Sequence, residues 1–577
     1  MKSLPGVVPE LIVYNATVHT VDAADTVAEA VAIGLGRIVA VGSNDDVRRL
    51  AGPDTRQIDL AGRTVTPGFV DAHPHLDTVG IRLIKFRFTQ TGSIAGLLGE
   101  LGREVARRRA GEWILCNPVV DEPDVFEYPA AFAEGRWPNR HDLDTVAPDN
   151  PVYIEPPSLV APGTAIANSA ALRACGITRD TRFPDGVSML TDASGEPTGV
   201  FEDYNFPKRV PVPDGGFDPV GSQFPAIPAF TRDDIRRAVA AGARAFNEAG
   251  VSTIYEGHGI PAVPQRAYLD LWQAGELTVR TYFVISYPVS AYADVESGRR
   301  LIEQTAVYAA GKGFGDDLLR FGGLGFSFDS AAAMGACLMR EPYLGALGRP
   351  WRGVQLPKDE VFRDILFRCA REGIRVQVQC SGGAAIDKVL ALYEEIDREI
   401  PILGKRWTIQ HCQFPSRGNM DTCCRLGVVP TTTTNFIWLY GSIYERSFGP
   451  EMASEAIPFR EWMDAGVPVA QCTDGRPHNP MFALWQMLAR KDAVSGKTLA
   501  TPQQKLSRQQ ALRAYTLNGA IAAFWDEVTG SIEPGKLADL VVLSDDIMSI
   551  DEDRIPDTKV LATLLGGKAV HDTGIFS

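Results

Sequence analysis

The stretch VDAHPHLD, which begins at Val70, contains two histidines separated by a single proline. The histidines follow the apolar run from Thr64 to Val70. In an extended strand, residues i and i+2 point to the same face, so His73 and His75 are expected to project side by side, about 6 to 7 Å apart. Two imidazoles in this arrangement can bind one divalent ion. An isolated histidine is more often a core or surface residue, so the metal hypothesis needs partners elsewhere in the chain.

Other residues with ligand-type side chains stand where further short apolar segments end. They are Glu256 and His258 in IYEGH, Asp329 in FSFD, Gln379 in QVQC, His411 in TIQHC, and Asp474 and His478 in CTDGRPH. With His73 and His75, five of the eight histidines in the chain occupy such positions, whereas random placement would scatter them. In a parallel β/α barrel the carboxyl ends of the strands meet at one face, so these segments predict a metal site there.

The elements that must position these residues follow from the alternation of helical and strand patterns. Between residues 67 and 527, helix-forming segments precede short, nearly continuous apolar strands, as in DEVFRDILFRCAREG before IRVQVQC. This is typical of a parallel sheet covered by helices, and seven or eight units predict an α/β fold with a distorted (β/α)8 TIM barrel. Pro- and Gly-rich stretches interrupt the rhythm at about 85–230, where we expect an inserted subdomain or lid over the barrel mouth.

The two ends of the chain have a different residue pattern from the middle. Residues 1–66 and 528–577 alternate Val- and Ile-rich runs with Gly and Asp turns, a pattern of antiparallel strands. Neither end has enough strands for a core of its own. We therefore predict that both termini meet in one small β-sandwich.

Bulk properties exclude several classes of function. The net charge is -14, with acidic and basic residues interspersed, which argues against nucleic acid or an anionic membrane surface as partner. The first residues, MKSLPGVVPELIV, lack the pattern of a signal peptide, and no run approaches the roughly 20 apolar residues of a membrane span. We expect a cytoplasmic protein. The nine cysteines show neither CxxC nor CxxxH spacing, so they indicate neither a disulfide framework nor a zinc finger.

Several motifs together resemble the amidohydrolase superfamily, and more narrowly amidohydrolase family 3, the branch that includes N-substituted formamide deformylases. The motifs are TPGFVDAHPHLD, SMLTDASGEPTGVFED, IQHCQF, CTDGRP and ALRAYTLNGAIAAFWDEVTGSIEPGKLADLVVL, in the family's order and nearly end to end. The resemblance implies a TIM barrel with a β-sandwich and one or two divalent metals. It implies metal ligands at the His-x-His pair, His73 and His75, at a later His, His411, and at a strand-8 Asp, Asp474.

Two positions depart from the family pattern. The family usually has His where Gln379 stands, and it has the metal-bridging carboxylated Lys where Gly325 stands. A glycine cannot bridge two ions, and an amide oxygen is a weak zinc ligand compared with imidazole. We therefore expect a mononuclear site with one divalent metal, zinc first, with iron or manganese as alternatives.

Roles around this metal site can be weighed individually. Asp474 is expected to be both ligand and general base, although it could instead cap the helix that follows. Glu256 and His258 could orient the ligands or replace the lost Lys, or they could simply pair with each other. His478 and Arg476 are candidates for facing the substrate. The turn SGGAAID, from Ser381, could hold an anion at a helix N-terminus or could be only a tight turn.

Three functions compete at this stage. The first is a metal-dependent hydrolase that cleaves a carbon–nitrogen bond of an amide-type small molecule. The second is a diverged, non-hydrolytic subunit of a metal-dependent oxygenase, similar to one partner of the 2-aminoisobutyrate hydroxylase pair, with one metal kept mainly for structure. The third is a binding protein without metal, which requires His73, His75, His411 and Asp474 to converge for no reason. The first predicts a homo-oligomer, and the second a hetero-oligomer with a paralogous subunit.

Overall fold

The computed structural model describes residues 2–4, 6–119, 129–130, 132–157, 162–184, 186–203, 220–260, 262–287, 289–344, 349–501 and 504–577. For residues 2, 3, 258–260 and 262 it describes the backbone only.

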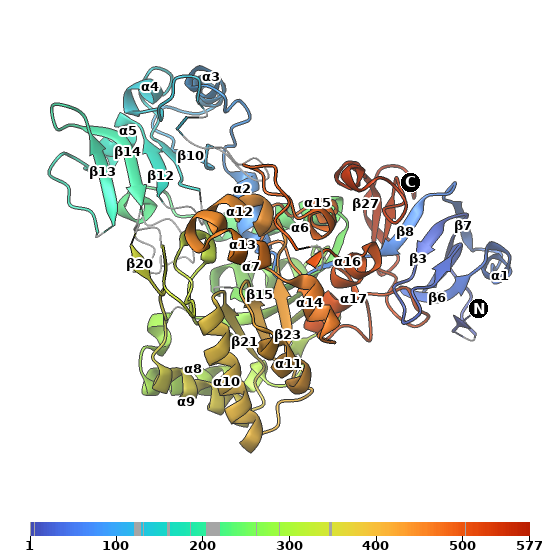
Figure 1. Cartoon of the computed structure of the whole chain (residues 1–577). Helices are drawn as coiled ribbons and strands as arrows, with labels where there is room; N and C mark the ends of the chain where they lie inside the picture. The colour runs from blue at the N-terminus through green and yellow to red at the C-terminus, as the bar shows by residue number, and fades with distance from the viewer. Residues whose placement is uncertain are drawn as a thin grey trace.

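A parallel sheet at the centre of the molecule curls into a nearly closed barrel (Figure 1). Apart from the short β17 (Phe314–Gly315), which pairs antiparallel with β18 at one side, the described sheet has eight strands that are neighbours in chain order: β9 (Phe69–Asp71), β15 (Val251–Ile260), β16 (Arg280–Ser286), β18 (Leu319–Ser327), β21 (Val376–Cys380), β22 (Thr408–His411), β23 (Val429–Thr432) and β24 (Ala470–Gln471). Every pairing between these strands is parallel. The Ala72 amide donates to the Gln471 carbonyl at 3.3 Å, so the first and last strands meet at a seam. The predicted distorted TIM barrel is confirmed.

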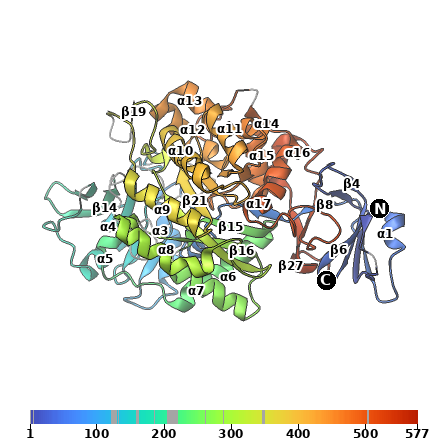
Figure 2. The same ribbon diagram turned by 90° about the horizontal axis from the view of Figure 1, so that it is seen from below.

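Helices surround this sheet, as the view from below shows (Figure 2). They are α2 (Leu76–Ile84), α6 (Arg232–Glu248), α7 (Ala262–Gln273), α8 (Val295–Ala309), α9 (Asp359–Arg371), α10 (Gly383–Glu399), α11 (Arg417–Leu426), α12 (Asn435–Phe448), α13 (Pro450–Glu455), α14 (Phe459–Asp464), α15 (Pro480–Ala489), α16 (Arg508–Ala514) and α17 (Leu517–Ala522). Local sequence explains where they begin. For α6, the Thr231 hydroxyl accepts from the Asp234 amide, and the Asp234 carboxylate accepts from the Thr231 amide, which satisfies two end groups.

The pair α2 and α6 packs closely because both helices carry a small residue at their crossing. A Cβ atom on Gly80 of α2 would lie 2.0 Å from the Ala238 carbonyl oxygen of α6. This contact fixes α2, the helix that directly follows the His73 and His75 segment.

Both ends of the chain build a β-sandwich beside the barrel, as their strand patterns predicted. One sheet has the order β1 (Lys2–Ser3), β6 (Arg37–Gly42), β5 (Ala30–Gly34), β2 (Leu11–Tyr14) and β7 (Arg56–Asp59). The other has the order β27 (Lys568–Asp572), β26 (Val560–Leu565), β25 (Leu540–Leu543), β8 (Thr64–Pro67), β3 (Thr17–His19) and β4 (Val27–Ala28). Apolar residues of both sheets, including Val31 and Ile33 in the first and Val65 and Leu540 in the second, share one core. Figure 1 shows the two termini close together at this end.

A separate sheet lies at the other side of the barrel, within the range where an insertion was expected (Figure 1). Its order is β10 (Ile114–Cys116), β11 (Val152–Ile154), β12 (Gly163–Ala167), β14 (Pro197–Asp203) and β13 (Val187–Thr191). The helices α3 (Ile94–Val105), α4 (Arg140–Asp144) and α5 (Ser169–Ala174) accompany it. Two buried apolar clusters pack around the sheet, so the insertion has a core of its own.

A buried ion pair ties the sandwich to the barrel. Asp539, just before β25, accepts from Arg280 of β16 through Nε at 2.6 Å and Nη2 at 2.8 Å. The same carboxylate accepts from the Thr529 hydroxyl at 3.0 Å and from the Gly566 amide at 2.8 Å. The Arg280 and Asp539 side chains are 7% and 0% exposed, so this junction is shielded from solvent.

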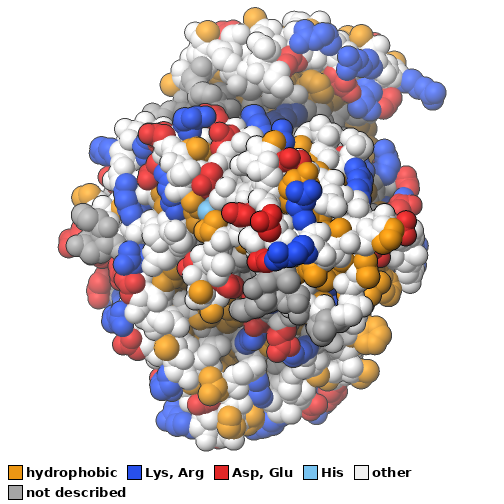
Figure 3. Space-filling model, turned by 90° about the vertical axis from the view of Figure 1, so that its right-hand side faces the viewer, with side chains coloured by type: hydrophobic (Ala, Val, Ile, Leu, Met, Phe, Trp, Pro, Cys, Tyr) orange, Lys and Arg blue, Asp and Glu red, His pale blue; other side chains and the backbone are white. Residues whose placement is uncertain are grey.

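Within the described residues, no helix is both long and apolar enough to cross a membrane. On the face that Figure 3 shows, Lys and Arg side chains alternate with Asp and Glu, and hydrophobic side chains are scattered among them.

Candidate metal centre

His73 and His75 follow β9, and Asp474 follows β24 across the seam. Asp474 Oδ1 lies 3.2 Å from His73 Nε2 and 3.1 Å from His75 Nε2. The two Nε2 atoms are 3.0 Å apart. His73 and Asp474 are 1% and 6% exposed, whereas the His75 side chain is 22% exposed, so the group is buried on one side and open to solvent at His75.

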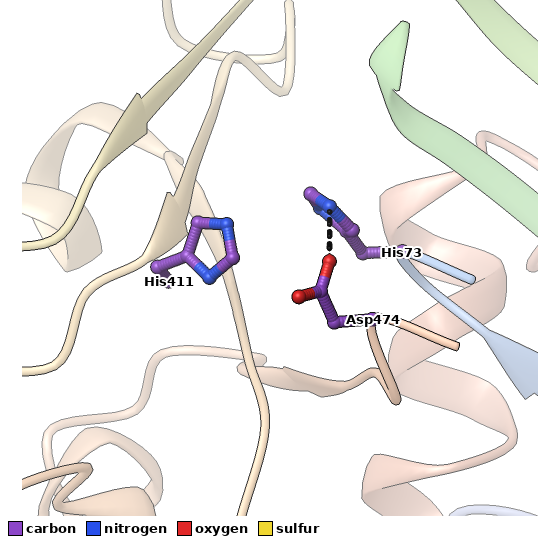
Figure 4. Close-up of side chains that lie close together, drawn as sticks. All are labelled: His73, His411 and Asp474. Atoms are coloured by element: carbon purple, nitrogen blue, oxygen red, sulfur yellow. Dashed lines mark ion pairs between the residues drawn. The ribbon is translucent and has the colours of Figure 1, made fainter. Parts of the chain in front are cut away.

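His411, at the end of β22, adds a third element to this group. Its ring centroid is 5.0 Å from that of His73. The potential ligand atoms of His73, His411 and Asp474 all lie within 4.8 Å of one another, and Figure 4 shows the His411 ring facing the other two side chains. Among the described residues, these three form the group of His, Cys, Asp or Glu side chains that could hold a metal ion. His75 is outside this group of three, although its Nε2 atom is close to two members.

The expectation that His73 and His75 share one extended strand is wrong. β9 ends at Asp71, and His75 has φ 51° and ψ 50° at the start of α2. The imidazoles still lie side by side, but a turn brings them together. His411 and Asp474 also have positive φ, 67° and 56°. Such backbone costs about 1 to 3 kcal/mol per non-glycine residue and persists where the surroundings enforce it, most often at functional sites.

The electrostatics of His411 and Asp474 suit a metal-binding group, whereas His75 is held protonated. Burial alone would lower the pKa of His75, but its hydrogen bond with Asp474 outweighs burial and raises the pKa to about 9, so metal binding there has to release a proton. Burial lowers the pKa of His411 to about 3, and the neighbouring His73 adds to this effect, so the imidazole is neutral at pH 7. Burial alone would raise the pKa of Asp474, but hydrogen bonds with His73 and His75 outweigh it and hold the pKa well below its usual value. Neutral imidazole and ionised carboxylate are the forms that bind metal ions.

Glu256, on β15, holds the backbone of this site. Its Oε2 accepts from the His75 amide at 3.2 Å, and its Oε1 accepts from the Leu76 amide at 2.7 Å. The carboxyl group is thus placed at the N-terminus of α2, where its two oxygens accept from backbone amides that have no partner within the helix. Burial raises the pKa of Glu256 to about 8, and the nearby Asp77 carboxylate adds to this. The side chain of His258 lies outside the described residues, so its proposed pairing with Glu256 stays a prediction.

Gln379, on β21, is directed to another carboxylate. Its Nε2 donates to Asp329 Oδ1 at 3.2 Å and to Ser381 Oγ at 2.9 Å. Asp329 in turn accepts from the amides of Ser381, Gly382 and Leu338 at 2.8 to 2.9 Å. The group held at the SGGAAID turn is therefore the chain's own Asp329, and burial raises its pKa to about 7 against the lowering effect of its bonds with the Ser381 and Gly382 amides.

The remaining predicted residues lie close to Asp474 in sequence. Arg476 is 8% exposed, and its charge contributes to the lowered pKa of His411, after burial, His73 and His75. The His478 ring stacks on Phe246 of α6, with centroids 5.2 Å apart and an angle of 20°. Burial lowers the pKa of His478 to about 4, helped by the charges of Arg87 and Arg82.

The alternative role of Asp474 as a helix cap is wrong. The following helix, α15, is capped by Asn479, whose side chain accepts from the Met481 amide at 2.9 Å.

With this barrel and its strand-end His and Asp group described, comparison with known proteins assigns the family. The amidohydrolase family profile matches residues 56–571. The chain belongs to the amidohydrolase family. This agrees with the resemblance of the sequence motifs to that superfamily.

Relatives of the chain extend over nearly its whole length. It is 24% identical to the protein LONG AFTER FAR-RED 3 of Arabidopsis thaliana, over 99% of this chain and 94% of that protein. It is 26% identical to an N-substituted formamide deformylase of Arthrobacter pascens, over 97% of both proteins. Among solved structures, an uncharacterized metal-dependent hydrolase from Pyrococcus horikoshii is similar with a TM-score of 0.71 and 20% identity, over 94% of this chain and 99% of that one. The structural likeness supports the fold.

Sequence reasoning missed one residue at this site. Asp71, two residues before His73, is 0% exposed, and its carboxylate bonds to the segments that carry His73 and Asp474. Burial raises the pKa of Asp71 to about 6, against the lowering effect of its bonds with Thr473 and His73. The signal was its place in VDAHPH, but its partner Thr473 is 402 residues away.

Proposed function

We propose that this protein is a metal-dependent hydrolase that cleaves a carbon–nitrogen, amide-type bond at a mononuclear site. The observation that carries the proposal is the convergence of His73, His411 and Asp474, with potential ligand atoms all within 4.8 Å of one another. His75 completes the donor set from the same side as His73. The family assignment and the named deformylase relative support amide-type chemistry.

The donor set fits one borderline divalent ion. Imidazole nitrogen together with one carboxylate oxygen suits zinc, and also iron or manganese. The residues that would hold the ion are His73, His75, His411 and Asp474.

Two observations favour one ion over two. Gly325, on β18, has no side chain to bridge a second ion, and it lies beside Gln377 of β21. Gln379 donates its amide hydrogens to Asp329 and Ser381. The side of the barrel where a second ion would sit therefore offers hydrogen-bonded amide groups in place of imidazole and Lys.

Each side chain at this site would then have a separate role in hydrolysis. His73, His75, His411 and Asp474 would hold the ion, whose Lewis acidity would lower the pKa of a water molecule and polarise the scissile carbonyl. Asp474 accepts the proton of the attacking water and passes it to the leaving nitrogen, a role that requires a carboxylate ionised at neutral pH. The position of Asp474 between His73 and His75 supports this role, and its lowered pKa keeps the carboxylate ionised, although it also makes the carboxylate a weaker base. Glu256 holds the His75 amide in place, and Arg476 and His478 are proposed to face the substrate.

The test is metal content and amide hydrolysis by the full chain. We expect about one ion per chain, loss of that ion in His411→Ala, and unchanged content in His141→Ala, which alters an exposed histidine of α4. The loaded protein should hydrolyse a member of a panel of N-substituted formamides and other N-acyl amines, and chelation should stop the reaction until metal is restored. Two ions per chain would contradict the mononuclear site, and an inert loaded protein would contradict amide hydrolysis.

Other expectations stay predictions. They are zinc as the native metal, a cytoplasmic location, a small-molecule substrate and a homo-oligomer. The oxygenase-subunit alternative predicts instead that the chain needs a co-encoded paralogue. Size-exclusion chromatography and activity of the chain expressed alone distinguish these two possibilities.

A further inference from the structure

The barrel closes at the metal centre, and it closes weakly. Among the described strands, no ladder pairs β9 with β24, which are the two ends of the parallel sheet. Two backbone hydrogen bonds cross the seam, from the Ala72 amide to the Gln471 carbonyl at 3.3 Å and from the Asp474 amide to the His73 carbonyl at 2.8 Å. The candidate ligands His73 and Asp474 stand on opposite sides of this seam, so their separation depends on what holds it closed.

One buried carboxylate spans the seam. Asp71 Oδ1 accepts from the His73 amide at 3.2 Å and from the Thr473 amide at 3.1 Å. Asp71 Oδ2 accepts from the Thr473 hydroxyl at 2.5 Å and from the Tyr515 hydroxyl at 3.4 Å. Asp71 and Thr473 are both 0% exposed. The same carboxylate thus bonds directly to one ligand residue and to the residue just before the other.

Thr473 extends this contact around Asp474. Its hydroxyl, which donates to Asp71, also accepts from the Gly475 amide at 3.1 Å. Its carbonyl accepts from the Arg476 amide at 3.0 Å. Asp474 lies inside the resulting turn with φ 56°, a conformation that a non-glycine residue adopts at a cost. The turn is therefore held from Asp71 through the Thr473 side chain.

We propose that Asp71 and Thr473 are positioning residues that set the distance between His73 and Asp474 and thereby set the affinity for the metal. Neither side chain is in the group of potential ligands, so they act through the backbone that carries the ligands. This inference rests on the proposed function, because ligand geometry matters only if these side chains bind a metal. Groups that orient metal ligands typically change metal affinity about 10- to 100-fold when they are removed.

The alternative is that the contact only stabilises the fold. Thr563, on β26, offers a matched control, since it is also 0% exposed and its hydroxyl donates to the Asn247 carbonyl at 2.7 Å. Thr473→Val and Thr563→Val remove the same chemical group from a buried site and leave a side chain of similar shape. A purely structural role predicts similar losses of stability in both variants and no change in metal affinity in either.

The experiment measures Zn²⁺ affinity by competition with a chromophoric chelator, and the visible absorption spectrum after Co²⁺ loading, on full chains shown by urea titration to be folded. We expect Thr473→Val to weaken binding about 10-fold or more and to alter the Co²⁺ spectrum. Thr473→Ser, which keeps the hydroxyl, should stay close to the wild type, and Thr563→Val should match it. Tyr515→Phe removes only the longest of the four bonds to Asp71, so it should give a smaller loss and provides a milder variant if Thr473→Val does not fold.

Two results would overturn the proposal, and they differ from each other. In the first, the wild type binds metal through His73, and folded Thr473→Val binds it equally well. If Thr473→Val does not fold, the same outcome in folded Tyr515→Phe counts instead. The positioning role is then wrong and the proposed function stands. If the wild type binds no divalent metal, or binds it unchanged in His73→Ala, both the proposed function and the positioning role fail.

Discussion

The ion pair between Arg280 and Asp539 offers the sharpest test of how the sandwich is joined to the barrel. The change is Asp539→Ala, which removes the carboxylate that accepts two hydrogen bonds from Arg280, one from Thr529 and one from Gly566. Arg280 would keep its bond to the Asp317 carbonyl at 2.7 Å, but its charge would lose its buried partner.

The expected loss follows from burial. Removing one partner of a buried ion pair costs about 3 to 5 kcal/mol, because the remaining charge is left in a medium of low dielectric constant. The buried Thr529 hydroxyl also loses its acceptor, at about 1 to 3 kcal/mol for a buried donor left unpaired, and the partly buried Gly566 amide loses less. These costs are not additive, since the groups can relax together, so we expect at least about 3 kcal/mol in total. Removing both charges, as in Arg280→Met with Asp539→Ala, should cost less than Asp539→Ala alone, because no unpaired charge remains.

The assay is urea unfolding followed by circular dichroism and by tryptophan fluorescence, since a chain of this size need not unfold in one step. The control is Arg236→Ala, which breaks an ion pair whose side chains are 33% and 55% exposed and should cost less than about 1 kcal/mol. The reasoning would be refuted if Asp539→Ala lowered the free energy of unfolding no more than Arg236→Ala. It would also be refuted if the double variant lost as much stability as Asp539→Ala alone, or more.

Further predictions concern a helix contact, a histidine and the metal centre. Gly80→Ala should destabilise the protein by about 1 to 3 kcal/mol, because the new Cβ would lie 2.0 Å from the Ala238 carbonyl oxygen; a melting temperature equal to the wild type would contradict this. The pKa of His478 falls to about 4 in the fold, below the usual 6.5, so only the unfolded chain gains a proton there as the pH drops from about 6.5 to 4, and stability is lost over that range. His478→Phe keeps a ring against Phe246 and should reduce this acid sensitivity by up to about 3 kcal/mol at pH 4 in urea titrations; equal pH profiles would argue against it. Zinc at 100 times its dissociation constant should stabilise the wild type by about 2.7 kcal/mol and His411→Ala much less, so equal thermal shifts would count against the site.

Residue patterns along the chain predict the barrel because each unit is local. A helical segment followed by an apolar strand can be recognised in a window of about 25 residues. The rule that strand ends meet at one face of the barrel then predicts, from the sequence alone, that His73, His411 and Asp474 lie together. The same rule places Gln379 and Asp329 at that face, but it does not show that they bond to each other. Strand-end position predicts which face a side chain is near, but not which partner it takes.

What could not be predicted depends on long-range contacts and on backbone conformation. The hydrogen bonds between Asp71 and Thr473 join residues 402 positions apart, and no pattern in the sequence predicts this contact. The positive φ of His75 also left no signal, because left-handed backbone is normally inferred from Gly or Asn. Both features lie at the seam where the first and last strands of the barrel meet, so they become visible only in the folded structure.

The sandwich has a consequence for folding during synthesis, because its strands come from both ends of the chain. β8 pairs with β25, and the apolar core that contains Val65 is completed by Leu540 and Leu564. On the ribosome, the N-terminal strands emerge first and must wait until nearly all of the barrel has been synthesised. At 5 to 20 residues per second this delay is roughly half a minute to a minute and a half. During that time an incomplete sheet edge and its apolar face stay exposed, so nascent chains are the stage at which this protein is most open to aggregation and to chaperone binding.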